Sequence, residues 1–158
     1  MARDEQALRD VVERAAAVLT AAGFPKMPAR VMMALTVTES GGLTAGELGE
    51  QLGVSAAAIS GAVRYLQTIG IVRRISQAGS RRDRYELPED AWYSAMSNET
   101  AVFSVLAAQA DAGAAAIDDP DSAARSRLSD MARFYRFFEI RMPMLIEEWA
   151  KIRDGQPE

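Results

Sequence analysis

The stretch of sequence that decides the fold covers residues 43–70 and reads LTAGELGEQLGVSAAAISGAVRYLQTIG. Two helices joined by a tight turn need a small residue where they touch and a residue that tolerates positive φ at the turn. Gly49 stands at the expected contact, and Gly53 stands four residues later at the expected turn. Apolar residues on both sides predict the core of the pair: Leu48, Leu52, Val54, Ile59, Ala62, Val63 and Leu66. The pattern predicts a helix-turn-helix.

Capping signals bound both helices of this pair. Thr44 and Glu47 have the spacing of a capping box, which starts a short helix that runs to Leu52. Ser55 is a favourable N-cap for the second helix. That helix is expected to run to Ile69, with a glycine after it as the stop signal.

The second helix separates into two faces at 100° per residue. Its inner face is apolar, and its outer face holds Ala57, Ser60, Gly61, Arg64 and Thr68. An ordinary solvated face is the alternative, but such a face is normally richer in Glu and Lys, and this one has no acidic residue. The composition favours a face that enters the major groove of DNA, where Ser60 can bond to either base type and Arg64 to guanine or a phosphate.

A β-hairpin is expected after Gly70, because the period changes from helical to alternating. Its tip lies at residues 77–81, and residues 79–85 read GSRRDRY. Three arginines so close together repel one another unless a polyanion lies nearby: Arg81, Arg82 and Arg84. Arginine can enter the minor groove or hold phosphates, and we expect Asp83 to orient a neighbouring arginine.

Other helices flank this region. Apolar spacing predicts a helix over residues 4–22 and a second that opens at Phe24-Pro25 and ends at residues 40–42. Another helix is expected from Pro88 through Ala110. Asp119 as cap and Pro120 as first residue are expected to start the last helix.

The last helix carries an apolar seam of nearly four heptads. Pro143 is expected to kink or interrupt it. A partner subunit is the expected cover of so long a seam, and packing against residues 4–22 and 89–116 is the alternative. The seam consists of two series with a period of seven, widened by two phenylalanines: Leu128, Tyr135, Met142 and Trp149; Met131, Phe138, Leu145 and Ile152; Phe134 and Phe137.

The composition of the 158 residues excludes several function classes. Without cysteine or histidine, the chain has no thiolate nucleophile, no usual general base and no common zinc site. The acidic clusters at residues 118–121 and 147–148 fit a helix start and a solvated face better than a Mg²⁺ site, so we expect no enzyme and no catalytic, cofactor or metal site. No apolar run reaches the length of a membrane span, and residues 1–22 lack a signal core, which makes the cytoplasm the expected location.

Charge is distributed unevenly along the chain. The net charge is −4, yet residues 55–85 carry six arginines against one aspartate, whereas residues 86–158 are net acidic at −7. A basic patch on an acidic body can hold phosphates without indiscriminate binding. A solvated arginine surface is the alternative, and the surrounding motif decides between it and a nucleic-acid contact at the second helix and the hairpin.

The chain resembles the MarR superfamily, and within it the GbsR-like branch. The resemblance covers about residues 20–90 and rests on Gly23-Phe24-Pro25 with Pro28-Ala29-Arg30, the turn at 43–54, residues 55–66, Gly70-Ile71-Val72 and the wing at 81–85. It implies a bacterial homodimeric repressor that small effectors often release. It also implies that Ser55, Ser60 and Arg64 read DNA, that Arg81, Arg82 and Arg84 hold the wing on it, and that Arg30 holds a phosphate. Gly61 departs from the bulky polar or basic residue of many relatives, which leaves base readout thin.

These observations predict a mainly α fold with a small β-hairpin wing, a winged helix-turn-helix with long terminal dimerisation helices. The expected division is residues 1–22 for dimerisation, 23–88 for double-stranded DNA and 89–158 for dimerisation, with the homodimer formed through 1–22 and 89–153. The function is then that of a transcriptional regulator on a pseudo-palindromic operator. A winged helix that binds an acidic protein partner is the alternative.

A third hypothesis, which depends on the regulator hypothesis, is an apolar effector cavity. It would be lined by Met32, Met33, Trp92, Phe134 and Phe138, although core packing explains each of these residues as well.

Overall fold

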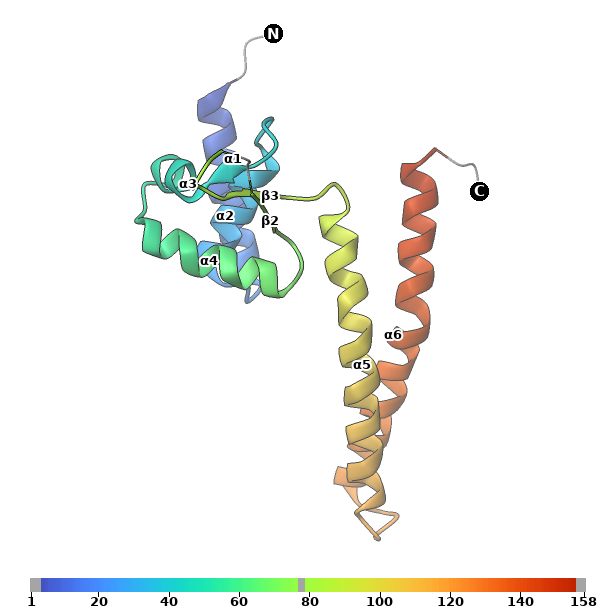
Figure 1. Cartoon of the computed structure of the whole chain (residues 1–158). Coiled ribbons are helices and arrows are strands. Elements are labelled where there is room, and N and C mark those ends of the chain that lie inside the picture. The colour runs from blue at the N-terminus through green and yellow to red at the C-terminus, as the bar shows by residue number, and fades with distance from the viewer. Residues whose placement is uncertain (1–3, 77–78, 156–158) are drawn as a thin grey trace. The chain divides into compact units, whose positions relative to one another are not determined.

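The computed structural model describes residues 4–76 and 79–155, with the backbone alone for residues 93–100. The chain forms two compact units, Met1–Trp92 and Tyr93–Glu158. The first unit contains α1 (Glu5–Ala21), α2 (Lys26–Thr36), β1 (Leu43–Thr44), α3 (Ala45–Leu52), α4 (Ala56–Thr68), β2 (Arg73–Ile75) and β3 (Arg84–Glu86). Figure 1 labels all of them except β1. The second unit holds α6 (Ala123–Arg153) and nearly all of α5 (Ala91–Ala115). The predicted fold class, mainly helical with a small sheet, is confirmed.

Helix α2 is the centre of the first unit, because α1, α3 and α4 all contact it. Its residues Ala29, Val31 and Ala34 have no exposed surface. The apolar residues predicted for the helix-turn-helix core are buried, apart from the half-buried Val54. These side chains contribute to the apolar burial that holds the unit together: Leu48, Leu52, Ile59, Ala62, Val63 and Leu66.

The turn between α3 and α4 forms as the sequence predicts. The Thr44 hydroxyl accepts from the Glu47 N–H at 3.2 Å, and the Glu47 carboxylate accepts from the Thr44 N–H at 2.7 Å, which completes the capping box. Gly53 has φ +65°, in the left-handed region. The Ser55 hydroxyl accepts from the N–H of Ala58 at 3.3 Å and caps α4.

The sheet has one strand more than the predicted hairpin. The strand order is β1-β3-β2 and both pairings are antiparallel, with Leu43 opposite Tyr85 and Arg74 opposite Tyr85 on the other side. The hairpin is confirmed, whereas β1 was not predicted. A strand of two residues is too short to show an alternating pattern, so only its pairing with β3 reveals it.

Helix α2 ends earlier than predicted, at Thr36 and not at residues 40–42. The residues that follow are β-branched, which disfavours helix continuation. The hydroxyls of Thr36 and Thr38 donate to the carbonyls of Met32 and Ala34, and such local bonds compete with the helical ladder. The sequence after Thr36 therefore forms a loop that leads to β1.

Helix α6 begins later than predicted. Ser122 is its N-cap and accepts from the Arg125 N–H, whereas Asp119 accepts from the N–H of Asp121 in the preceding turn. The prediction that Asp119 and Pro120 start the helix is therefore wrong. The helix continues through Pro143 as far as Arg153, so it is not interrupted there.

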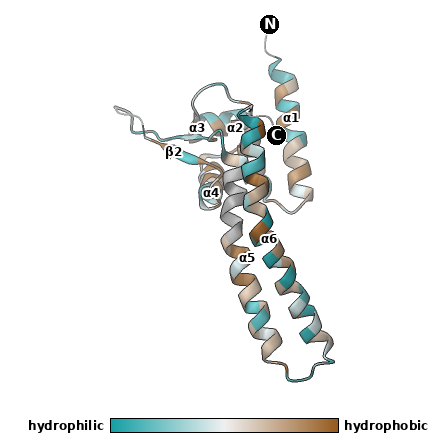
Figure 2. Cartoon of the chain, turned by 90° about the vertical axis from the view of Figure 1, so that its right-hand side faces the viewer, coloured by the Kyte–Doolittle hydropathy of each residue, from teal (hydrophilic) through white to brown (hydrophobic). Residues whose placement is uncertain are grey.

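The apolar seam of α6 is covered in part by α5. Phe103 of α5 stacks on Tyr135 and also contacts Phe138, with ring centroids 5.8 and 5.7 Å apart. Figure 2 shows that apolar residues recur along α6. Half or more of the surface is still exposed on seven large apolar side chains of this helix: Phe134, Phe137, Ile140, Met144, Leu145, Trp149 and Ile152. Within the described parts of the chain, no helix combines the length and the apolar character that a bilayer span requires.

Two glycines of α3 should respond in opposite ways to alanine. A Cβ at Gly49 would lie 2.9 Å from the carbonyl oxygen of Val54, too close for any real contact, whereas a Cβ at Gly46 has its nearest neighbour at 3.9 Å. Gly49→Ala should lower the free energy of unfolding by about 1–3 kcal/mol through overpacking. Gly46→Ala should raise it by ~0.5 kcal/mol through helix propensity. Urea denaturation measures both, and equal effects would contradict the close approach of α3 and α4.

Candidate nucleic-acid interface

The outer face of α4 brings five of the predicted site residues together, and Ser55 lies at the N-cap of the same helix. The inner face holds Ile59 and Leu66, both without exposed surface. Arg64 is the one charged residue in the sequence of α4. Ser55 at the N-cap and the five outer-face residues are all exposed: Ala57, Ser60, Gly61, Arg64 and Thr68.

The hydroxyls of the N-cap and of the last residue of α4 already have partners in the protein. Ser55 accepts from the Ala58 N–H, and the Thr68 hydroxyl donates to the Arg64 carbonyl at 2.9 Å. A Cβ at Gly61 would meet nothing within 4 Å, so the space beside it is open. A DNA backbone or base edge can approach α4 closely at Ala57, Ser60 and Gly61, and Arg64 supplies the charge.

The wing places two of its arginines at the tip. Arg81 and Arg82 are exposed and follow Gly79, which has φ +83°. Residues 77 and 78 of the predicted tip lie outside the described residues. Among the described residues, Arg64, Arg81 and Arg82 have no ion-pair partner.

The arginines at the base of the wing are paired. Asp83 lies 3.4 Å from a guanidinium nitrogen of Arg74, in agreement with its predicted orienting role, and Arg73 forms an ion pair with Glu86. Exposed pairs of this kind contribute little to stability. They do reduce the positive charge that the base of the wing presents to a ligand.

Arg84 is placed apart from the two arginines of the tip. It lies in β3, where its Nη2 and Nε donate to the carbonyl oxygen of Gly42 at 2.6 and 3.2 Å. Its Nη2 is 3.6 Å from the carboxylate of Glu47. Its predicted contact with DNA remains a prediction, and the structure gives its side chain intramolecular partners.

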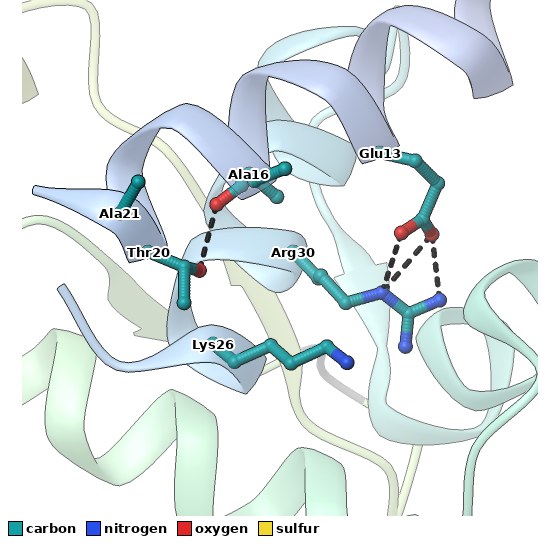
Figure 3. Close-up of a pocket in the computed structure, with 7 residues that line it drawn as sticks. Glu13, Ala16, Thr20, Ala21, Lys26 and Arg30 are labelled. Carbon is teal, nitrogen blue, oxygen red and sulfur yellow. Dashed lines mark hydrogen bonds and ion pairs between the residues drawn. The ribbon is translucent and has the colours of Figure 1, made fainter. Parts of the chain in front are cut away.

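Arg30 is likewise engaged within the first unit. Its Nε and Nη2 both donate to the carboxylate of Glu13 on α1, and Nη2 also donates, at 2.9 Å, to the carbonyl oxygen of Leu52 at the end of α3. Figure 3 shows this pair beside Lys26. Sequence reasoning missed the role of Arg30 as a link between α1, α2 and α3, because the link joins residues that are 17 and 22 positions apart.

An open groove of about 550 Å³ lies beside this link, between α1 and α2 (Figure 3). Apart from Glu13, Lys26 and Arg30, its lining consists of small residues: Ala16, Ala17, Thr20 and Ala21. It contains none of the five residues of the predicted effector cavity. Of those, Met32 is core of the first unit at 2% exposure, and Phe134 and Phe138 contact each other in α6.

Glu47, in the first turn of α3, faces Arg84 of the wing. Its pKa lies below the ordinary value of a glutamate, first because the Thr44 N–H donates to it. The Thr44 hydroxyl and the charges of Arg84 and Arg82 act in the same direction, and burial opposes them. The charged form of Glu47 is therefore the form that stabilises this corner of the unit.

Two family models match the chain. A model of the MarR family matches residues 22–83. A model of MmpR5-like MarR family transcriptional regulators matches residues 90–152. Among curated protein sequences, none matches the chain.

Solved structures are similar to the chain as well. A protein described as a transcriptional regulator aligns with a TM-score of 0.81 at 22% identity, over 91% of this chain and 98% of that protein. Staphylococcus aureus MepR, described as a transcription regulator of the multidrug efflux pump MepA, aligns with a TM-score of 0.42 at 10% identity, over 97% of this chain and 78% of its own. The first alignment shows a shared fold, and the score of the second is too low to carry an argument.

The lowered pKa of Glu47 predicts a pH-dependent contribution to stability. Because the folded pKa lies below the unfolded one, the contribution is present above the unfolded value and is lost as the pH falls through the folded pKa. Glu47→Gln should lower the urea midpoint near pH 7, and the difference from wild type should close as the solution is acidified. Glu50→Gln removes an exposed carboxylate from the same helix and controls for charge. A difference that stays constant with pH would contradict the assignment.

Proposed function

Since family models of MarR-type transcriptional regulators match residues 22–83 and 90–152, we propose that the chain is a homodimeric regulator that binds double-stranded DNA at a pseudo-palindromic operator. One observation carries the proposal. The exposed face of α4 and the tip of the wing present Arg64, Arg81 and Arg82 without an ion-pair partner among the described residues. Exposed guanidinium groups of this kind are suited to phosphates and base edges.

Helix α4 enters the major groove, and the wing follows the phosphates or the minor groove beside it. Ser60 and Arg64 are the side chains of α4 that reach base edges. Because Ala57 and Gly61 offer no polar group, few side chains of α4 can form hydrogen bonds to base edges. Sequence preference therefore depends also on DNA shape and on the spacing of two half-sites about one helical turn apart.

The homodimer forms through residues 1–22 and 89–153. The exposed apolar residues of α6 support this part of the proposal, because contiguous apolar surface on a helix calls for a cover. The regulator acts as a repressor, and a small effector releases it. Membership of the GbsR-like branch stays a prediction that rests on the motifs of residues 20–90.

Fluorescence anisotropy tests the proposal directly. The purified protein is titrated onto duplex from its own upstream region and onto scrambled duplex, at several salt concentrations. Tight binding that prefers the upstream duplex and weakens steeply with salt is expected. Equal, weak binding to both duplexes would contradict the proposal and favour the alternative, a winged helix that binds an acidic protein.

The double variant Arg81→Ala/Arg82→Ala should weaken binding to every duplex. If each arginine neutralises one phosphate, the slope of log K against log salt should become shallower by about 1.8. Salt-dependent anisotropy measures both quantities. Arg133→Ala removes an exposed arginine of α6 and is the matched control. An unchanged slope in the wing variant would exclude the tip from the interface.

The double variant Leu145→Lys/Ile152→Lys should convert the dimer to a monomer near 17.1 kDa. Both side chains are more than half exposed and lie seven residues apart on one stripe of α6, so lysine there places charge in the proposed interface without disturbing the core. Sedimentation velocity measures the mass. Ser126→Lys/Asp130→Lys, on the polar side of α6, should leave it unchanged. A wild-type chain that sediments as a monomer would contradict the homodimer.

A further inference from the structure

Arg84 joins β3 to two segments of the first unit that are distant from it in sequence. Its side chain extends from β3, and its fork of donors holds the carbonyl oxygen of Gly42, in the loop before β1. The same guanidinium faces Glu47 in the first turn of α3. Only 21% of the side chain is exposed, against 67% for Arg73 and 56% for Arg74 in the neighbouring strand. Most of its surface is thus unavailable to a phosphate.

At Gly42, the backbone of the loop before β1 lies close to the backbone of β3. Gly42 is buried and has φ +104°. A Cβ there would lie 2.5 Å from the carbonyl oxygen of Tyr85, the residue after Arg84. Glycine therefore lets the loop press against β3, in a conformation that other residues rarely adopt.

The Glu47 end ties the contact to the helix-turn-helix. The Glu47 carboxylate accepts from the Thr44 N–H at 2.7 Å and so caps α3. It is also the carboxylate that Arg84 faces at 3.6 Å. One carboxylate thus serves both the start of α3 and the base of the wing, and α3 contacts α4 directly.

We infer that Arg84 is a positioning residue for DNA binding, which locks the base of the wing to the Gly42 loop and to α3. We name this arrangement the Arg84 clip, made of Gly42, Glu47 and Arg84. The inference rests on the proposed function, because it describes how the wing is held for the duplex. The clip keeps Arg81 and Arg82 at a set distance from α4, so that the wing tip and α4 contact the same duplex. Binding then costs no conformational entropy for ordering the wing at each encounter.

A lysine in place of Arg84 separates this role from phosphate binding. Lysine keeps the charge, which a phosphate contact needs, but lacks the planar fork that holds the Gly42 carbonyl. In the free protein, Arg84→Lys should accelerate amide hydrogen exchange about tenfold in residues 42–47 and 79–87, the segments that the clip joins. Arg73→Lys, which alters an exposed ion pair of the same hairpin, is the control and should leave exchange in residues 42–47 unchanged. Unchanged exchange in Arg84→Lys would overturn the clip.

A second variant tests the link to DNA. Arg84→Met should weaken duplex binding about three- to tenfold at every salt concentration while the salt slope stays that of the wild type. Arg82→Met should make the slope shallower by about 0.9, the signature of one lost phosphate contact. The same loss of slope in Arg84→Met would overturn the inference and make Arg84 a DNA contact. If the wild-type protein shows no preference for the upstream duplex, the proposed function fails, and the exchange measurement still decides whether the clip exists.

Discussion

The contact between α3 and α4 at Gly49 is the constraint on which the rest of the first unit depends. The absence of a side chain lets the backbone of α3 approach the carbonyl of Val54, and Gly53 turns the chain between the two helices. The contact between the two helices leaves Ile59 and Leu66 of α4 buried in the core. Because α4 can bury only one of its faces, its outer face stays exposed. A single close approach therefore fixes both the core and the surface offered to a ligand.

Arginine has two distinct roles in the first unit. Arg30 and Arg84 each donate to a backbone carbonyl and face a carboxylate, and each joins elements that are distant in sequence. Arg64, Arg81 and Arg82 are exposed and have no ion-pair partner among the described residues. Guanidinium suits both roles, since its fork of donors fits carbonyl and carboxylate groups as well as phosphates. Exposure, and not residue type, separates the arginines that hold the fold from those that are free to bind DNA.

Most of the helix-turn-helix could be predicted from sequence, because its signals are local. The capping box of Thr44 and Glu47 and the turn at Gly53 involve residues a few positions apart, and the two faces of α4 follow from helical geometry. The roles of Arg30 and Arg84 could not be predicted, because their partners lie up to 42 positions away. Strand β1 was missed because two residues show no period, and the start of α6 because Asp119-Pro120 carries the same capping signal as Ser122. The packing of Phe103 on the seam of α6 likewise depends on tertiary structure.

An NMR titration of the labelled protein with upstream duplex tests most directly whether the outer face of α4 is the surface that contacts DNA. Backbone amides report each residue separately, so the interface is read along the chain without substitutions. We predict that chemical-shift changes concentrate in residues 55–68 and 79–84 and saturate with the upstream duplex before the scrambled one. Changes confined to α6, or equal responses to both duplexes, would contradict a role for α4 in reading DNA.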